Sequence, residues 1–214
     1  MTAIVDARPR AAGPPDPGVV AEVAAVLRAG RVVVLPTDTV YGLAASPTVA
    51  GATDRVFAAK GRTAEVPLAV LCSAPDQALA LADPAAVSDR VRRLARRLWP
   101  GPLTLVLPRR PDLAYALGEP ATTVGVRCPD HPLLRAVAAA VGPIATTSAN
   151  HHGEPTPEGA AEVAALFGDE VALVVDGGRC AGAPSTVVDA TGPTLTPLRL
   201  GPLSLAEVER AAAP

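Results

Sequence analysis

Residues 31–43 read RVVVLPTDTVYGL, an apolar run that gives way to polar side chains. The β-branched part, residues 31–36, is bounded by a glycine and a proline and predicts a short strand that is buried on both faces. Two hydroxyls and a carboxylate, from Thr37, Asp38 and Thr39, follow directly. Because α/β proteins bind ligands at the ends of their strands, this stretch indicates both a fold class and a candidate site.

Strands and helices alternate outward from this stretch. Val19, Val23, Val26 and Leu27 recur at helical spacing before Gly30 and predict a helix closed by a glycine cap. The same patterns predict strands at 67–72, 103–107, 124–127, 144–147, 171–176 and 185–189, and helices at 50–59, 87–98, 132–141, 157–167 and 204–213. This order predicts an α/β domain around a sheet that is at least partly parallel.

The domain is expected to begin near Gly18. Residues 7–17 read ARPRAAGPPDP, a composition that cannot form a packed core, so residues 1–17 are interpreted as a flexible lead-in. No internal repeat or linker divides the rest of the sequence. We therefore expect residues 18–214 to form a single domain.

Composition excludes several classes of function. The 214 residues contain 19 Lys and Arg against 21 Asp and Glu, and a formal net charge of -2 argues against a general polyanion binder. Aromatic residues make up 2% of the chain, too few for a surface on which single-stranded nucleic acid bases stack. A basic cleft inside this neutral total must come from local groups of residues.

The three cysteines, Cys72, Cys128 and Cys180, form no Cys-x-x-Cys pair, which argues against a zinc site or a disulfide framework. The N-terminal residues lack the apolar region of a signal peptide. No apolar run approaches the roughly 18 residues that a membrane span needs. We expect a cytoplasmic protein with no membrane segment.

Two polar segments have alternative interpretations. The hydroxyls and carboxylate of residues 37–39 either orient a small polar ligand or form a helix cap, in which one of them binds a backbone N–H. Lys60, the only lysine of the chain, and Arg62 flank a glycine after a predicted helix. The two cations either bind one phosphate group or stabilise the C-terminus of that helix.

Two more polar segments follow predicted strands. Thr123 and Arg127 lie on one face of their strand by the period of two, and an arginine in such apolar surroundings needs an anionic partner from the protein or from a ligand. Residues 146–150, TTSAN, form either an anion-binding turn or an ordinary loop.

Other polar groups are weaker candidates. His151 and His152 have no metal-ligand spacing around them, and we interpret them as solvated loop residues. The common glycine-rich nucleotide motifs are absent from the sequence, as is any convincing Ser-His-Asp or Cys-His arrangement. A dense basic run on the helix at 87–98 is either a solvated face or a docking surface for tRNA or a protein, and consists of Arg90, Arg92, Arg93, Arg96 and Arg97.

The ordered set of motifs along the chain is far more specific for a protein family than any single motif is. They are PTDTVYGL (36–43), KGR (60–62) followed by PL (67–68), WPGPLTLVL (99–107), TVGVRCPDHP (123–132), TTSAN (146–150), PSTVVD (184–189) and LRLG (198–201). In sequence and order they resemble the YrdC/Sua5 family of threonylcarbamoyl-adenylate synthases. The resemblance runs from about Gly18 to Gly201.

The resemblance implies that L-threonine, bicarbonate and ATP give threonylcarbamoyl-AMP and pyrophosphate, the first step of t6A37 synthesis in tRNA. It implies a YrdC-like fold, a twisted mixed sheet with flanking helices and a basic concave cleft. It further implies that Mg²⁺ accompanies ATP and that a separate threonylcarbamoyl transferase complex receives the product, and it leaves a weak direct contact with tRNA open.

Site residues follow from the same motifs, with Lys60 and Arg62 as the catalytic pair. The resemblance assigns L-threonine to Thr37, Arg127, Thr146 and Ser185. It assigns ATP to Lys60, Arg62, Thr123, Ser148, Asn150, Thr156 and Arg199. It implies no metal site made by protein side chains.

Three positions depart from the family pattern. Val66 stands where many members have Asn, Leu71 where they have His, and His152 where they have Ser. The Asn and His are proposed ligand contacts in the family, so the poses of ATP and threonine are open at these points. The extra C-terminal domain of longer members is not matched after Gly201, which predicts a single-domain form.

Two rival functions remain. One is the carbamoyl-adenylate chemistry of hydrogenase maturation, although the zinc-finger and acylphosphatase modules expected beside it are not found in the sequence. The other is a non-catalytic module that binds double-stranded RNA or tRNA. The complete set of substrate-type residues argues against the second, because a pure binder would not need it.

Overall fold

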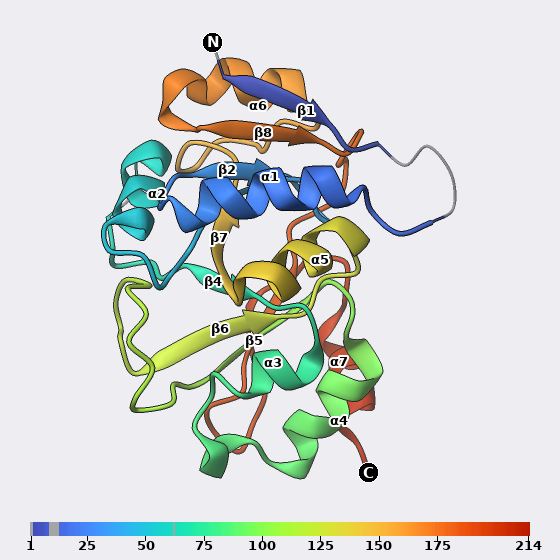
Figure 1. Cartoon of the computed structure of the whole chain (residues 1–214). Coiled ribbons are helices and arrows are strands. Elements are labelled where there is room, and N and C mark those ends of the chain that lie inside the picture. Colours follow the sequence, from blue (N-terminus) through green and yellow to red (C-terminus); the bar gives the residue numbers. More distant parts are fainter. Residues whose placement is uncertain (1, 9–12, 62) are drawn as a thin grey trace.

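The structure is a computed structural model that describes residues 2–8, 13–61 and 63–214. These residues form one ten-stranded sheet with helices on both faces, in the order β1-β8-β2-β3-β7-β4-β6-β5-β9-β10 (Figure 1). The strands are β1 (Ala3–Asp6), β2 (Val33–Leu35), β3 (Gly42–Ala45), β4 (Ala69–Leu71), β5 (Leu103–Pro108), β6 (Thr123–Arg127), β7 (Ile144–Ser148), β8 (Leu173–Asp176), β9 (Thr186–Asp189) and β10 (Thr196–Arg199).

The helices begin at residues that suit helix starts. The Ser88 hydroxyl caps α4, Pro132 opens α5, and Ser204 forms a capping box with Glu207 at the start of α7. No helix in the described ranges is long and apolar enough to cross a bilayer. The helices are α1 (Pro17–Arg28), α2 (Ala52–Lys60), α3 (Pro75–Leu79), α4 (Asp89–Leu98), α5 (Pro132–Val141), α6 (Ala160–Phe167) and α7 (Leu205–Ala212), with 3-10 turns η1 (Pro84–Ala86) and η2 (Gly168–Glu170).

The sheet is mixed, as the resemblance implied. The pairs β1–β8, β8–β2, β4–β6 and β5–β9 are parallel, and the other five neighbouring pairs are antiparallel. Each strand and helix expected from the sequence is present, α5 with the expected bounds and the others with shifted ends, whereas β1, β3, β10 and α3 were not expected. Two of these strands read GLAA and TPLR, and their weak β-propensity explains why the pattern missed them.

The expected lead-in is partly wrong. Residues 3–6 form strand β1, which pairs in parallel with β8 in a four-residue register from Ala3 opposite Leu173 to Asp6 opposite Asp176. Helix α1 begins at Pro17, with the Asp16 carboxylate accepting from the backbone N–H of Gly18. The proline-rich stretch after β1 includes residues 9–12, which lie outside the described residues.

The sheet separates two hydrophobic cores. Val34 of β2 and Val32 just before it belong to a core with side chains of α2, α4, α6 and α7, whereas Val33 and Leu35 belong to a core with α1 and α5. This alternation is the two-residue period of a strand that is buried on both sides. Figure 1 looks onto the face that carries α1 and α5. We call it the α1/α5 face.

Candidate functional site

Polar side chains from strands β6 and β7 project from the α1/α5 face. On β6, Arg127 pairs with Leu71, which belongs to the core with α1 and α5, and Thr123 lies on the same face by the period of two. On β7, Ile144 belongs to that core and Thr146 follows it at the same parity. Strand alternation therefore brings residues predicted for both substrates to one face.

Strands β5, β9 and β10 extend this polar face. The antiparallel register places Thr104 opposite Arg127, and Val187 pairs with both Thr104 and Arg199. Ser185 precedes Val187 by two residues, and its hydroxyl lies 2.9 Å from that of Thr104. Six of the predicted site residues thus share one side of the sheet, namely Thr123, Arg127, Thr146, Ser148, Ser185 and Arg199.

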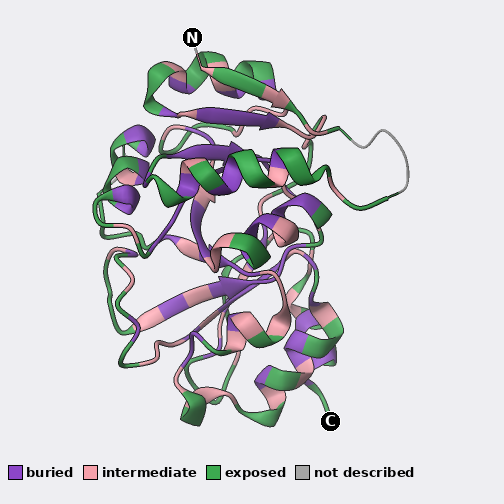
Figure 2. Ribbon diagram, viewed as in Figure 1, coloured by how far each residue is buried: buried purple, intermediate pink, exposed green. Residues whose placement is uncertain are grey.

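The middle of the polar face is open. Strand β6 alternates between half-buried residues, Thr123 and Gly125, and buried ones (Figure 2). Val106 and Val187 on the neighbouring strands are likewise half-buried. Within the described ranges, the cores place only α1 and α5 on this face, and they pack over β2, β8 and the start of β7. Strands β6, β5 and β9 are therefore not covered by the helices of this core, and they carry small and aliphatic side chains on this face.

Lys60 forms the centre of a polar cluster at the end of β7. The residue is 3% exposed, and Nζ donates to the Ser148 carbonyl at 2.6 Å, to Ser148 Oγ at 3.0 Å and to Asn150 Oδ1 at 2.5 Å. Thr156 Oγ1 lies 3.4 Å from the same amide oxygen. Four residues assigned to ATP are therefore together, and Lys60 reaches beyond the C-terminus of its own helix. Arg62, the other predicted catalytic cation, lies outside the described residues.

Arg127 forms a second polar cluster at the end of β6. Its Nη2 donates to Asp38 Oδ1 at 2.5 Å, Nη1 to Thr39 Oγ1 at 3.1 Å and Nε to the Gly101 carbonyl at 3.0 Å. The two charged side chains are 6% and 13% exposed, so this is a nearly buried ion pair. The anionic partner expected for Arg127 is thus a protein carboxylate, which the sequence analysis had not paired with it.

The Thr37 side chain hydrogen-bonds to the backbone of the residues that follow it. Its Oγ1 accepts from the backbone N–H groups of Thr39 and Val40 and donates to the Val40 carbonyl at 2.7 Å. It also lies 2.9 Å from Thr39 Oγ1, so it is linked to Arg127 through one hydroxyl. Residues 38–40 form a bend between β2 and β3 and no helix begins there, so the helix cap is wrong, although Thr37 does bind backbone N–H groups. A role for Thr37 in binding threonine stays a prediction.

The loop after β8 holds the segment 37–41 in place. Tyr41 is buried, its hydroxyl donates to the Gly178 carbonyl at 2.6 Å, and burial raises its pKa to about 12. The Gly182 N–H donates to the Thr39 carbonyl, and a β-carbon at Gly182 would lie 2.7 Å from that oxygen. The glycine permits this close approach, so the hydroxyls and the carboxylate of the segment have fixed positions.

Arg199 and Ser185 form a third polar cluster. Arg199 donates through Nε to the Ser185 carbonyl at 2.9 Å and through Nη2 to its hydroxyl at 3.1 Å. Partial burial and the positive charge of Arg127 both lower the pKa of Arg199, so the two predicted cations lie within electrostatic reach of each other. Thr104, which bonds to Ser185, joins this cluster, and the sequence analysis did not single it out because only the register shows its position.

The three departures from the family pattern have different settings. Val66 is 47% exposed, whereas Leu71 is buried in the core beside α1 and α5. His152 donates its backbone N–H to the Lys60 carbonyl at 3.2 Å. His151 packs edge-on against Phe167 with ring centroids 5.3 Å apart, so it is not purely a solvated loop residue as expected.

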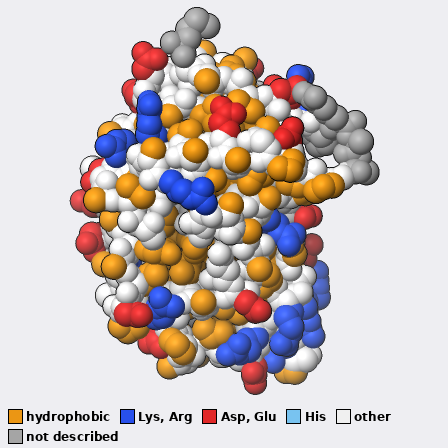
Figure 3. Space-filling model, in the orientation of Figure 1, with side chains coloured by type: hydrophobic (Ala, Val, Ile, Leu, Met, Phe, Trp, Pro, Cys, Tyr) orange, Lys and Arg blue, Asp and Glu red, His pale blue; other side chains and the backbone are white. Residues whose placement is uncertain are grey.

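Three arginines of the basic run on α4 hydrogen-bond to backbone carbonyls of the protein. Arg93 donates to the Ala212 carbonyl and Arg97 to the carbonyls of Ala211 and Ala213, which cap the C-terminus of α7. Arg90 binds two backbone carbonyls near residue 192. Figure 3 shows basic side chains gathered at the lower right, over α4. Three of these five arginines therefore also hydrogen-bond within the fold, and a docking surface for tRNA or a protein stays a prediction.

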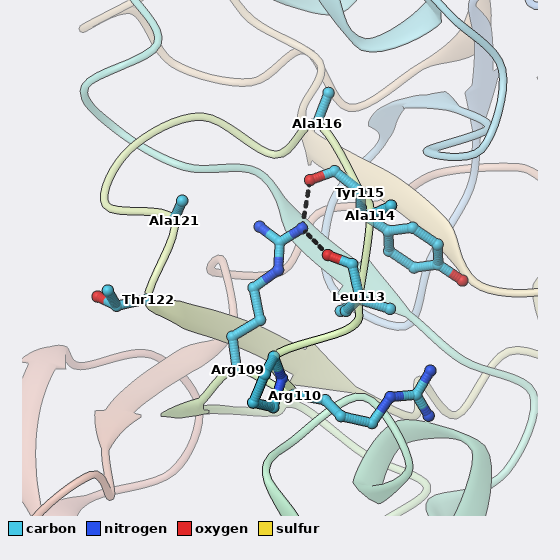
Figure 4. A pocket seen from close by; sticks show the side chains of 9 residues that line it. Arg109, Arg110, Leu113, Ala114, Tyr115, Ala116, Ala121 and Thr122 are labelled. Carbon is cyan, nitrogen blue, oxygen red and sulfur yellow. Dashed lines mark hydrogen bonds between the residues drawn. The ribbon is translucent and has the colours of Figure 1, made fainter.

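A separate pocket of about 650 Å³ lies in the connection between β5 and β6 (Figure 4). Arg109 donates to the carbonyls of Leu113 and Tyr115 and so ties this loop together. Residues 121 and 122 line the pocket and precede Thr123, but it contains none of the predicted site residues. The candidate site is therefore the open α1/α5 face and not this hollow.

Comparison with known proteins gives the chain a family. The Sua5/YciO/YrdC family model, whose description reads "Telomere recombination", matches residues 25–201. The chain belongs to this family. This Sua5/YciO/YrdC chain is 35% identical over 174 residues to the threonylcarbamoyl-AMP synthase of Klebsiella pneumoniae, covering 80% of this chain and 90% of that protein. It is 38% identical to the threonylcarbamoyl-AMP synthase of Bacillus subtilis, covering 91% of this chain and 57% of that protein.

Solved structures of the family agree with the fold. Pyrococcus abyssi Sua5 in complex with L-threonine superposes with a TM-score of 0.90 at 36% identity and covers 98% of this chain, which spans 61% of that structure. Escherichia coli YciO superposes with a TM-score of 0.82 at 23% identity, covering 97% of this chain and 98% of that one, and supports the fold alone. The YrdC-like fold predicted from the motifs is confirmed.

Proposed function

We propose that this chain is a threonylcarbamoyl-AMP synthase that joins L-threonine, bicarbonate and ATP. The observation that carries the proposal is the placement of separate cationic clusters, around Lys60 and around Arg127 with Arg199, on one open face of the sheet. Names of relatives support it, as does the threonine bound to the Pyrococcus abyssi protein. The reaction classes the chain as a nucleotidyltransferase.

The proposed chemistry joins two anions. The threonine amine takes up CO2 from bicarbonate and becomes a carbamate with loss of a proton. A carbamate oxygen then attacks the α-phosphorus of ATP, and the bond to pyrophosphate breaks. The protein's main task is to neutralise charge and align the reactants, without a nucleophile of its own.

The clusters divide this task. Lys60, with Ser148 and Asn150 fixing its ammonium group, would bind the polyphosphate, and Arg62 is proposed as the second phosphate-binding cation. Arg127 would bind the threonine carboxylate. The hydroxyls of Thr146 and Ser185 would hydrogen-bond to the polar groups of threonine, which lets the site reject analogues that lack those groups. Thr123, Thr156 and Arg199 complete the proposed ATP contacts.

Mg²⁺ is proposed to arrive with ATP. No group of three His, Cys, Asp or Glu side chains that could hold a metal occurs among the described residues. Mg²⁺ commonly keeps several waters and binds substrate phosphates, so it needs no dedicated protein cage and would help to neutralise the triphosphate. The hydroxyls of Ser148 and Thr156, which lie in the Lys60 cluster, would be the oxygen groups available to it there.

The proposal also covers the partners and location. The labile product would pass to a separate threonylcarbamoyl transferase complex in the cytoplasm. Direct tRNA binding is not needed for this reaction, and the internal hydrogen bonds of α4 leave little reason to invoke it.

Pyrophosphate release tests the proposed function. We expect purified protein with ATP and Mg²⁺ to release pyrophosphate only when L-threonine and bicarbonate are both present, and chelation of Mg²⁺ to stop the reaction. Release at the same rate without threonine would refute the proposal.

Gly125 gives a test of where the ligands bind. A β-carbon there would make only ordinary contacts, 3.6 Å from Thr104 Cγ2 and 3.9 Å from Ala69, so packing does not require the glycine. We expect Gly125→Val to keep the free energy of unfolding within about 1 kcal/mol, since valine favours strands. Its side chain would project into the open face and reduce kcat/KM about tenfold or more through ligand displacement.

The matched control for this variant is Gly192→Val. Gly192 lies in an exposed turn, and a β-carbon there has no neighbour within 4 Å among the described residues. Thermal unfolding measures the stability of both variants, and steady-state kinetics measures their kcat/KM. Full activity of Gly125→Val would show that neither substrate crosses β6.

A further inference from the structure

We propose that Asp38 is a positioning residue that fixes the guanidinium of Arg127 for the threonine carboxylate. This inference rests on the proposed function and assigns a role to a residue that the motifs left without one. Asp38 Oδ1 lies 2.5 Å from Arg127 Nη2, in a pair that is almost buried.

The open face creates the need for such a residue. An arginine side chain that is 6% exposed requires a counter-charge even when no ligand is bound, since an unpaired buried charge is costly. A counter-charge that used every N–H of the arginine would also block the substrate. Asp38 supplies the counter-charge, and the number of hydrogen bonds that Arg127 makes shows that the substrate is not blocked.

Arg127 retains donors for a ligand. Of its five N–H groups, three are directed at Asp38, Thr39 and Gly101. In the described part of the chain, one N–H on each of Nη1 and Nη2 remains without a recorded partner. Three acceptors from separate segments thus fix the orientation of the plane while two donors stay available to a carboxylate.

The backbone holds Asp38 firmly in this position. Its neighbours Thr37 and Thr39 bond to each other, and the Thr39 carbonyl accepts from the N–H of Gly182. A carboxylate fixed on both sides orients its partner more precisely than a flexible surface chain would. Displacement of a substrate-binding group by about 1 Å can cost on the order of 10² in rate.

The consequence is a selective effect on threonine. Asp38→Asn keeps the shape and one acceptor oxygen but removes the charge. We expect it to raise the KM for L-threonine about 10- to 100-fold. The KM for ATP should change by a clearly smaller factor, because the Lys60 cluster shares no residue with the Arg127 cluster.

Two companion variants separate positioning from folding. Asp38→Glu restores the charge and should recover part of the threonine KM. Thr39→Val removes the acceptor for Arg127 Nη1 without changing any charge and should shift the threonine KM in the same direction by a smaller factor. Thr39→Val also carries the test if Asp38→Asn does not fold.

Steady-state pyrophosphate release, with each substrate varied in turn, measures both KM values, and calorimetry measures threonine binding directly. Equal shifts in the two KM values, or an unchanged threonine KM and affinity in the folded variants, would overturn the inference. Failure of the proposed function would show separately, as wild-type protein that releases no pyrophosphate in response to threonine.

Discussion

Lys60→Met is expected to lower kcat for threonine-dependent pyrophosphate release by a factor on the order of 10² to 10³. Methionine keeps an unbranched side chain in the same buried space but cannot neutralise the transferring phosphate. Asn150 Oδ1 would still accept from Ser148 Oγ at 2.6 Å, so the loop after β7 keeps an internal hydrogen bond. The loss should therefore appear in the rate while the fold remains intact.

Arg92→Met is the matched control for this variant. Arg92 lies exposed on α4, and its replacement removes the same charge from the protein without touching the site. Circular dichroism should show both variants folded. Retention of more than half of the wild-type kcat by folded Lys60→Met would rule out its role as a phosphate-binding cation.

Arg127→Met is expected to lower the free energy of unfolding by about 3–5 kcal/mol. The change leaves the Asp38 side chain, which is 13% exposed in the intact pair, without its cation, and this is the costly way to break a buried ion pair. It also removes the donors to Thr39 and Gly101. Urea unfolding monitored by the fluorescence of Trp99 measures the loss.

The double variant Arg127→Met with Asp38→Asn separates charge from packing. The amide carries no charge to desolvate, so the double variant should be more stable than Arg127→Met alone by about 1 kcal/mol or more. Neither protein should respond to threonine. Equal stabilities of the single and double variants would show that the unpaired Asp38 carboxylate does not lower the free energy of unfolding.

The sequence predicted most of the sheet because its buried strands are continuous β-branched runs. Strand β2 is the clearest example, with valines that pack alternately into the two cores. Strand β3 was missed since Gly-Leu-Ala-Ala has neither the propensity nor the alternation of a strand, and its pairing with β2 and β7 imposes the extended form. Edge strands β1 and β10 depend in the same way on one neighbour.

Periodicity also predicted part of the candidate site. Thr123 and Arg127 were placed on one face by counting in twos, and the structure bears this out. The ion pair of Arg127 with Asp38 joins positions 89 residues apart, and local pattern contains no information on such a contact. The bond between Thr104 and Ser185 is equally non-local. The local sequence thus predicted which strand ends carry polar side chains. Which of these side chains contact one another depends on the strand register and on non-local contacts.

The most direct test of the proposed synthesis is incorporation of ¹⁴C-bicarbonate into an adenylate. Wild-type protein with ATP, Mg²⁺ and L-threonine should form a labelled product that contains AMP and threonine, in equal amount with pyrophosphate, and Lys60→Met should form almost none. Pyrophosphate released without labelled adenylate, or label incorporated without threonine, would contradict the account.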